Sequence, residues 1–188
     1  MPVTIGAAPA ADFTQPLGML MDCHRRIERF LGALVQVAER AKGGEMNAME
    51  KRDWLNALEY FRNAAPRHTA DEEESLFPRL RNIGGRKVEA ALDDVKRLQA
   101  EHVRADAVHA QVDEIGRRWI EQQSLSQEDT TRVRGALAEL TRLYGPHLEL
   151  EDRTLFPIAA EVLPRSDLSE MGAEMAHRRG LDKSRVLS

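Results

Sequence analysis

Apolar residues recur at steps of three and four along most of this chain, which is the spacing of one face of an α-helix. The first series starts at Leu17 and stops before Gly43-Gly44, a pair that favours a helix end. The second starts near Asn47, which can form a capping box with Glu50 three residues later, and stops at Gly84-Gly85. These signals predict two long helical segments.

The second half of the chain predicts two more long helices and a short one. A third helix is expected over roughly Arg86 to Gln122, and Ser126 has the residue type of an N-cap for a fourth. Residues 166–179 are expected to form the short helix. Pro66 and the pair Gly145-Pro146 fall inside helical patterns, so we expect a kink or break at Pro66 and a break at Gly145-Pro146.

Short loops between successive helices favour antiparallel neighbours. We therefore predict an all-α fold, namely an up-down-up-down antiparallel four-helix bundle with a short C-terminal fifth helix. We expect a flexible N-terminal arm over residues 1–15, the bundle over 16–180 and a C-terminal tail over 181–188.

Histidines and glutamates replace apolar residues at matching depths of this pattern. Residues 68–78 and 147–157 both begin with His-x-x-x-Glu and end with Leu-Phe-Pro. At about 1.5 Å per residue, the histidines of all four helices fall within roughly one turn of the same level. A His and a Glu at i and i+4 share one helix face. The residues of this polar layer are His24, His68, Glu72, His102, His147 and Glu151.

A single histidine on a helix seam is more often a hydrogen-bonded core residue than a ligand. Burying four imidazoles and two carboxylates without a cation would be costly, because buried ionised groups need partners. Nitrogen and oxygen donors without thiolate suit iron, manganese or zinc. The duplicated phrase therefore predicts a pair of metal ions held between the helices.

Composition narrows the function classes. The 188 residues carry a net charge of −4 with no basic block, so neither the charge nor its distribution indicates nucleic-acid binding. Cys23 is the only cysteine, which rules out an internal disulfide and fits a reducing compartment. The chain has no apolar run of about 20 residues and no signal-peptide pattern. We therefore expect a cytoplasmic protein without a membrane span.

The His and Glu pattern resembles the hemerythrin-like (HHE cation-binding) domain family, in its H-HxxxE-H-HxxxE variant, from Leu17 to Gly180. The resemblance implies two iron ions joined by an oxo or hydroxo bridge, with manganese or zinc as substitutes. It also implies terminal histidine ligands and bridging glutamates. The terminal ligands would be His24, His68, His102 and His147, and the bridging ligands would be Glu72 and Glu151.

Oxygen-carrying hemerythrins have a fifth histidine ligand four residues after the third-helix histidine, where this chain has Asp106. That departure weakens the case for reversible oxygen carriage, and it leaves an open position expected on both irons. Asp106, Glu28, Glu73 and Tyr144 are further candidates for ligation or for contact with the ligands.

Three function classes fit this pattern. The first is a module that binds O2, peroxide or NO as a carrier or sensor, or that stores iron. The second is an enzyme with catalase-like or iron–sulfur-cluster-repair activity. The third is a metal-stabilised scaffold. The first two fit a role in oxidative or nitrosative stress. The expected partners are small molecules, and the sequence does not indicate which protein, if any, is a partner.

Overall fold

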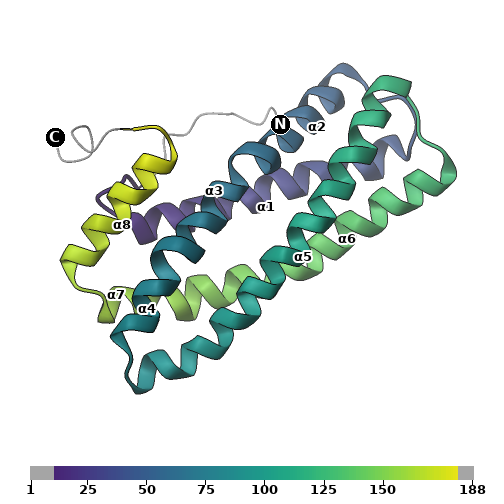
Figure 1. The fold of residues 1–188 in the computed structure, drawn as a ribbon. Helices are drawn as coiled ribbons and strands as arrows, with labels where there is room; N and C mark the ends of the chain where they lie inside the picture. Colours follow the sequence, from purple (N-terminus) through teal and green to yellow (C-terminus); the bar gives the residue numbers. More distant parts are fainter. Residues whose placement is uncertain (1–10, 182–188) are drawn as a thin grey trace.

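The computed structural model describes residues 11–181, and over this range the chain is an all-helical bundle without strands (Figure 1). The four long helices are α1 (Pro16–Ala41), α2 (Ala48–Asn63), α5 (Arg86–Gln122) and α6 (Gln127–Leu150). Shorter helices continue α2 and α6 and complete the fold. They are α3 (Ala65–Ala70), the π-helix η1 (Asp71–Leu76), α4 (Phe77–Ile83), the π-helix η2 (Glu151–Leu155), α7 (Phe156–Val162) and α8 (Arg165–Arg178).

The helix starts follow the capping signals of the sequence. The side chain of Asn47 accepts hydrogen bonds from the backbone N–H groups of Met49 and Glu50, and Glu50 accepts one from the N–H of Asn47. The hydroxyl of Ser126 accepts a hydrogen bond from the N–H of Asp129. These contacts satisfy N–H groups that a helix start leaves without partners. The predicted starts of the second and fourth helices are confirmed.

The two internal prolines behave differently. The break predicted at Pro66 is confirmed, because α2 ends at Asn63 and α3 begins at Ala65 after a one-residue turn. The break predicted at Gly145-Pro146 is wrong, because α6 continues through it. Pro66 lies in the first turn of α3, where its missing N–H breaks no helical hydrogen bond. Pro146 instead lies inside α6, next to a glycine whose lack of a Cβ relieves part of the steric conflict with the ring.

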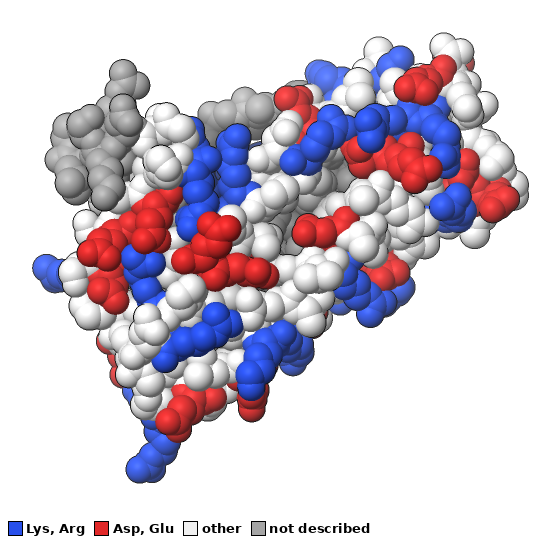
Figure 2. Space-filling model, viewed as in Figure 1, with Lys and Arg blue, Asp and Glu red and all other residues white. Residues whose placement is uncertain are grey.

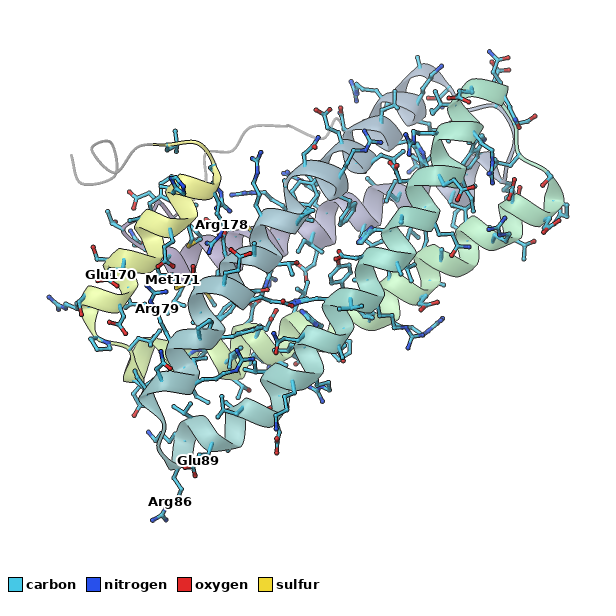
Figure 3. The ribbon with its side chains drawn as sticks, in the orientation of Figure 1. Arg79, Arg86, Glu89, Glu170, Met171 and Arg178 are labelled. Atoms are coloured by element: carbon cyan, nitrogen blue, oxygen red, sulfur yellow. The ribbon has the colours of Figure 1, made fainter. Side chains whose placement is uncertain are left out.

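The long helices lie side by side (Figure 1). Helix α1 packs against α2 and α6, and α5 packs against α6 and α2. The short helix predicted at the C-terminal end is confirmed as α8, which packs on α1 and η1. Figure 3 shows Arg79 of α4 and Arg178 of α8 in the seam between these helices.

Two apolar clusters fill the interior, one on each side of the polar layer that contains the site. The first surrounds Trp54 and Trp119, whose rings meet edge to face with centroids 5.1 Å apart. The second surrounds Phe77 and Phe156 and includes residues of α8. Along α1, His24 lies between Leu20 of the second cluster and Ile27 of the first. The histidines therefore occupy a buried layer within the core.

The predicted flexible arm and tail lie mostly outside the described residues, which exclude 1–10 and 182–188. Within residues 11–15 of the arm, Ala11 and Phe13 pack on the second apolar cluster, and the other three residues are exposed. Ala11 is buried, and its N–H donates to the carboxylate of Asp22 at 2.9 Å. A side chain at Gly172 of α8 would overlap the carbonyl oxygen of Phe13, so only glycine permits this approach.

Acidic and basic side chains are interspersed over the face formed by α3, α4, α5 and α8 (Figure 2). Many pair across helices, as Arg104 does with Glu139 at 2.7 Å. Such exposed pairs contribute about 0–1 kcal/mol each, so the apolar clusters dominate stability. Within residues 11–181, every helix is too short or too polar to serve as a membrane span.

Candidate metal centre

Each half of the chain presents its glutamate where an α-helix widens into a π-helix. The N–H of Phe77 donates to the carbonyl of Glu72, and the N–H of Phe156 donates to the carbonyl of Glu151, both five residues back. A proline follows each phenylalanine, and a proline has no N–H and crowds the carbonyl four residues earlier. The widened turn before Pro78 accommodates that ring. Isolated π turns of this kind occur frequently at functional sites.

The side chains of the polar layer form two groups, each with two histidines and one glutamate. In the first group, Nε2 of His68 lies 3.3 Å and Nε2 of His24 lies 3.7 Å from Oε1 of Glu72. The donor atoms of this group all lie within 4.8 Å of one another, and all three residues are buried. They come from α1, α3 and η1, and thus from two sides of the bundle.

The second group repeats the first. Nε2 of His147 lies 3.3 Å from Oε2 of Glu151, and the Nε2 atoms of His102 and His147 are 3.2 Å apart. These three residues are also buried, with donor atoms within 4.8 Å of one another. They come from α5, α6 and η2. The sequence repeat thus becomes a repeat of geometry.

The two glutamates connect the groups. Oε2 of Glu72 lies 3.4 Å from Nε2 of His102, although Oε1 of the same carboxylate faces the first group. Oε2 of Glu151 lies 3.3 Å from Nε2 of both His147 and His24. Each carboxylate therefore reaches donors of both groups, which is the arrangement that a pair of neighbouring cations requires.

Several polar atoms of this layer are buried without a hydrogen-bond partner among residues 11–181. They include both carboxylate oxygens of Glu72 and of Glu151 and Nε2 of His24. Buried polar atoms in proteins are nearly always paired, because leaving one unpaired costs about 1–3 kcal/mol. Metal coordination would satisfy these atoms, so the donor set fits a bound cation.

Protonation states within the layer are strongly perturbed. Burial and the neighbouring carboxylate of Glu151 raise the pKa of Glu72 to about 8. Burial and the adjacent imidazole of His24 hold the pKa of His68 well below its usual value. Burial also opposes the charged form of His24, but the hydrogen bond to Asp152 and the nearby carboxylates of Glu151 and Glu72 raise its pKa well above the usual value.

Carboxylates orient three of the four imidazoles. Nδ1 of His24 lies 2.7 Å from Asp152, Nδ1 of His102 lies 2.8 Å from Glu73, and Nδ1 of His147 lies 2.8 Å from Glu101. A carboxylate accepts the Nδ1 proton, which directs the Nε2 lone pair to the centre of the layer. Nδ1 of His68 has no such partner among residues 11–181.

Sequence reasoning missed Asp152 and Glu101 as residues of the site. A signal for Asp152 was present, because an acid directly follows the glutamate of each half, Glu73 after Glu72 and Asp152 after Glu151. Glu101 had no such signal. Its role depends on how α5 and α6 face each other, which a periodic pattern does not specify.

The additional candidates are placed at different distances from the layer. Glu73 contacts His102, as described above. Tyr144 shares a hydrogen bond of 3.0 Å with His109, and its ring centroid lies 6.2 Å from that of His147. Asp106 lines a small cavity together with three of the four histidines. Glu28 is not brought to the site, since its exposed carboxylate pairs with Arg25 at 3.1 Å.

Comparison with known proteins agrees with this geometry. The sequence model of the hemerythrin HHE cation binding domain matches residues 15–159. An uncharacterized protein of Haemophilus influenzae is 26% identical over 170 residues, covering 90% of this chain and 92% of that protein. The family match contains all six histidine and glutamate residues of the two groups, and it ends before α8. The chain belongs to the hemerythrin HHE cation-binding domain family and is a metal-binding protein.

Proposed function

We propose that this protein holds two iron ions and uses them to bind or react with small oxygen or nitrogen species, namely O2, peroxide or NO. The observation that carries the proposal is the pair of buried His2Glu groups that Glu72 and Glu151 connect. His24 and His68 would hold one ion, and His102 and His147 the other. The family match supports metal binding, and the mixed nitrogen and oxygen donors suit iron, manganese or zinc. The resemblance to hemerythrin-like domains is what favours iron among these metals.

The chain's own residues would hold the ions and control what reaches them. Asp152, Glu73 and Glu101 fix three imidazoles with Nε2 directed inward. The apolar clusters on both sides exclude water, and the principal helices, which we propose run up, down, up and down, bring the donors to one level. Bound iron would supply the redox chemistry, as metal cofactors generally do.

A small cavity beside both groups supports a reactive centre over a metal-stabilised scaffold. This cavity, of about 20 Å³, is lined by His68, His102 and His147. It is large enough for about one water-sized molecule. A purely structural metal site is normally closed by protein ligands, whereas a reactive one keeps a position open. The proposal therefore includes a role in oxidative or nitrosative stress or in iron handling within the cytoplasm.

Two measurements test this proposal, metal analysis and absorption spectroscopy. Both use protein that is purified without oxygen and loaded with ferrous iron. We expect about two irons per chain and near-ultraviolet bands that change on exposure to O2, peroxide or NO. Sustained oxygen evolution from peroxide would identify a catalase-like enzyme, and a reversible O2 spectrum would identify a carrier. If the protein binds two irons tightly but its spectrum does not change with any of the three molecules, the proposal is contradicted. The metal-stabilised scaffold would then be the remaining function.

A further inference from the structure

A pocket opens to the surface between α2 and α5, on the side of the bundle that leads to the metal-binding layer. Its volume is about 330 Å³, and much of its wall is apolar, with Leu34, Leu58, Phe61 and Val112 among the lining residues. It is therefore large enough to admit several small molecules. We call it the outer pocket.

The small cavity beside the histidines, which we call the inner cavity, adjoins the outer pocket. Phe61, Asp106 and His109 line both of them. The inner cavity touches His68 of the first metal-binding group and His102 and His147 of the second. Neither Glu72 nor Glu151 lines it. A molecule that passes the shared residues thus arrives on the side of the layer that the carboxylates leave open.

Some charged side chains that line the outer pocket have ion-pair partners, and one does not. Arg62 and Asp113 line the outer pocket and form an ion pair of 2.5 Å, and Arg117 contacts Asp113 at 2.8 Å. Asp106 forms no ion pair or hydrogen bond within residues 11–181. Asp106 is exposed, and within residues 11–181 it presents a carboxylate without an ion-pair partner at the wall that the outer pocket and the inner cavity share.

We propose that small molecules reach the metal centre through the outer pocket and the inner cavity, and that Asp106 makes this route selective for uncharged molecules over anions. The inference rests on the proposed function. An unpaired carboxylate repels an anion that approaches to close range through Coulomb forces, and these forces weaken as salt is added. Uncharged O2, NO or hydrogen peroxide feels no such barrier. Asp106 acts as a specificity-determining residue and not as a metal ligand.

Association rates of a charged and an uncharged probe test the selectivity. Azide, an anion at neutral pH, and NO are mixed with the iron-loaded full-length protein, and the change in absorbance is followed. Asp106→Asn should raise the azide association rate roughly three- to thirtyfold at low ionic strength, as expected for removing one charge at close range. The NO rate should stay unchanged. At about 1 M salt, where screening acts within about 3 Å, the azide gain should largely disappear.

Two further variants complete the test. Glu121→Gln removes one negative charge from the exposed end of the same helix, far along α5, and should leave both rates unchanged. Ala110→Trp fills the outer pocket from an exposed position and should slow azide and NO alike. Equal azide rates in Asp106→Asn and the wild type would overturn the selectivity. Unaltered rates in Ala110→Trp would overturn the route.

Failure of the inference can be told from failure of the proposed function. If azide and NO both bind iron-loaded wild type but Asp106→Asn changes neither rate, only the role of Asp106 is refuted. If neither probe alters the spectrum of protein with two irons per chain, the proposed function is refuted together with the inference.

Discussion

His24 of α1 and Asp152 of η2 are 128 positions apart in the chain, yet Nδ1 of the imidazole lies 2.7 Å from the carboxylate. Arg25 contacts the same carboxylate from the surface side. The Nδ1 proton donated to Asp152 leaves Nε2 of His24 free to bind a metal. This contact therefore links the two halves of the chain through the orientation of one imidazole.

The first prediction concerns this contact. Asp152→Ala should lower metal affinity by about 10- to 100-fold, the usual cost of removing a carboxylate that orients a ligating histidine. Competition with a coloured chelator measures the affinity. Glu28→Ala is the matched control, since Glu28 also pairs with Arg25 but does not reach the layer, and it should leave metal affinity unchanged. Equal affinities of Asp152→Ala and wild type would contradict the orienting role.

The second prediction concerns His68, which is buried beside Glu72. Metal that binds only the folded state stabilises it by about 2.7 kcal/mol at a concentration 100 times its Kd. His68→Ala removes a donor, so its Tm should rise much less than that of wild type when ferrous iron is added. Differential scanning calorimetry with and without iron measures this increment. His177→Ala, at an exposed position of α8, should retain the full increment. A full increment in His68→Ala would exclude His68 as a ligand.

Much of this architecture follows from local sequence signals. Helix periodicity and capping residues predict α1, α2, α5, α6 and α8 because each signal acts within a few positions of the chain. The duplicated His-x-x-x-Glu phrase predicts the polar layer, since helical rise converts sequence position into depth. The close approach of His102 Nε2 to His147 Nε2, at 3.2 Å, shows that residues 45 positions apart reach the same level.

Features that depend on relative rotation of helices escape such reasoning. Glu28 and Asp152 are both acids near the polar layer, but only Asp152 points to a histidine. The pattern of α1 does not say which side of His24 faces η2. The continuity of α6 through Pro146 also escapes a local rule that treats every internal proline as a helix break. Asp106 could be named from its i+4 spacing, but its place at a cavity junction needed the packed structure.

The third prediction concerns pH. In the metal-free protein, the folded-state pKa values of His24, His147 and Glu72 are raised, the last to about 8. Burial opposes the raised values of the histidines, but carboxylate partners outweigh it. A group with a raised folded-state pKa stabilises the fold while protonated and loses that contribution as pH rises through this value. Metal-free protein should therefore become less stable between pH 6.5 and 8.

Urea denaturation at several pH values measures this loss. His68 and His102 have lowered folded-state pKa values, so they oppose this loss only near pH 6.5, where the same histidines are still partly protonated in the unfolded chain. Glu72→Gln should flatten the dependence, because a glutamine gives up no proton. Metal loading should also flatten the pH dependence of stability. Metal binding should release protons at pH 7, and titration calorimetry in buffers of different ionisation enthalpy detects this release. A stability that rises from pH 6.5 to 8 would contradict the assignment.

The fourth prediction concerns the attachment of α8 to the metal-binding segment. Asp71, next to Glu72, is fully buried and pairs with Arg178 at 3.0 Å and Arg179 at 2.7 Å. Removing both arginines leaves a buried charge without compensation, which costs about 3–5 kcal/mol. The double variant Arg178→Ala, Arg179→Ala should lose that much stability in urea denaturation of the metal-free protein.

A matched control and a rescue variant show whether the lost stability comes from these ion pairs or from the removal of any surface charge. Arg153→Ala removes an exposed arginine whose only ion-pair partner within residues 11–181 is the exposed Glu149, and the stability of this variant should change by no more than about 0.5 kcal/mol. Adding Asp71→Asn to the double variant removes the stranded charge and should recover part of the loss. A double variant as stable as Arg153→Ala would show that α8 is held by its apolar contacts alone. Partial recovery by Asp71→Asn would instead show that α8 stabilises η1 by neutralising the carboxylate beside Glu72.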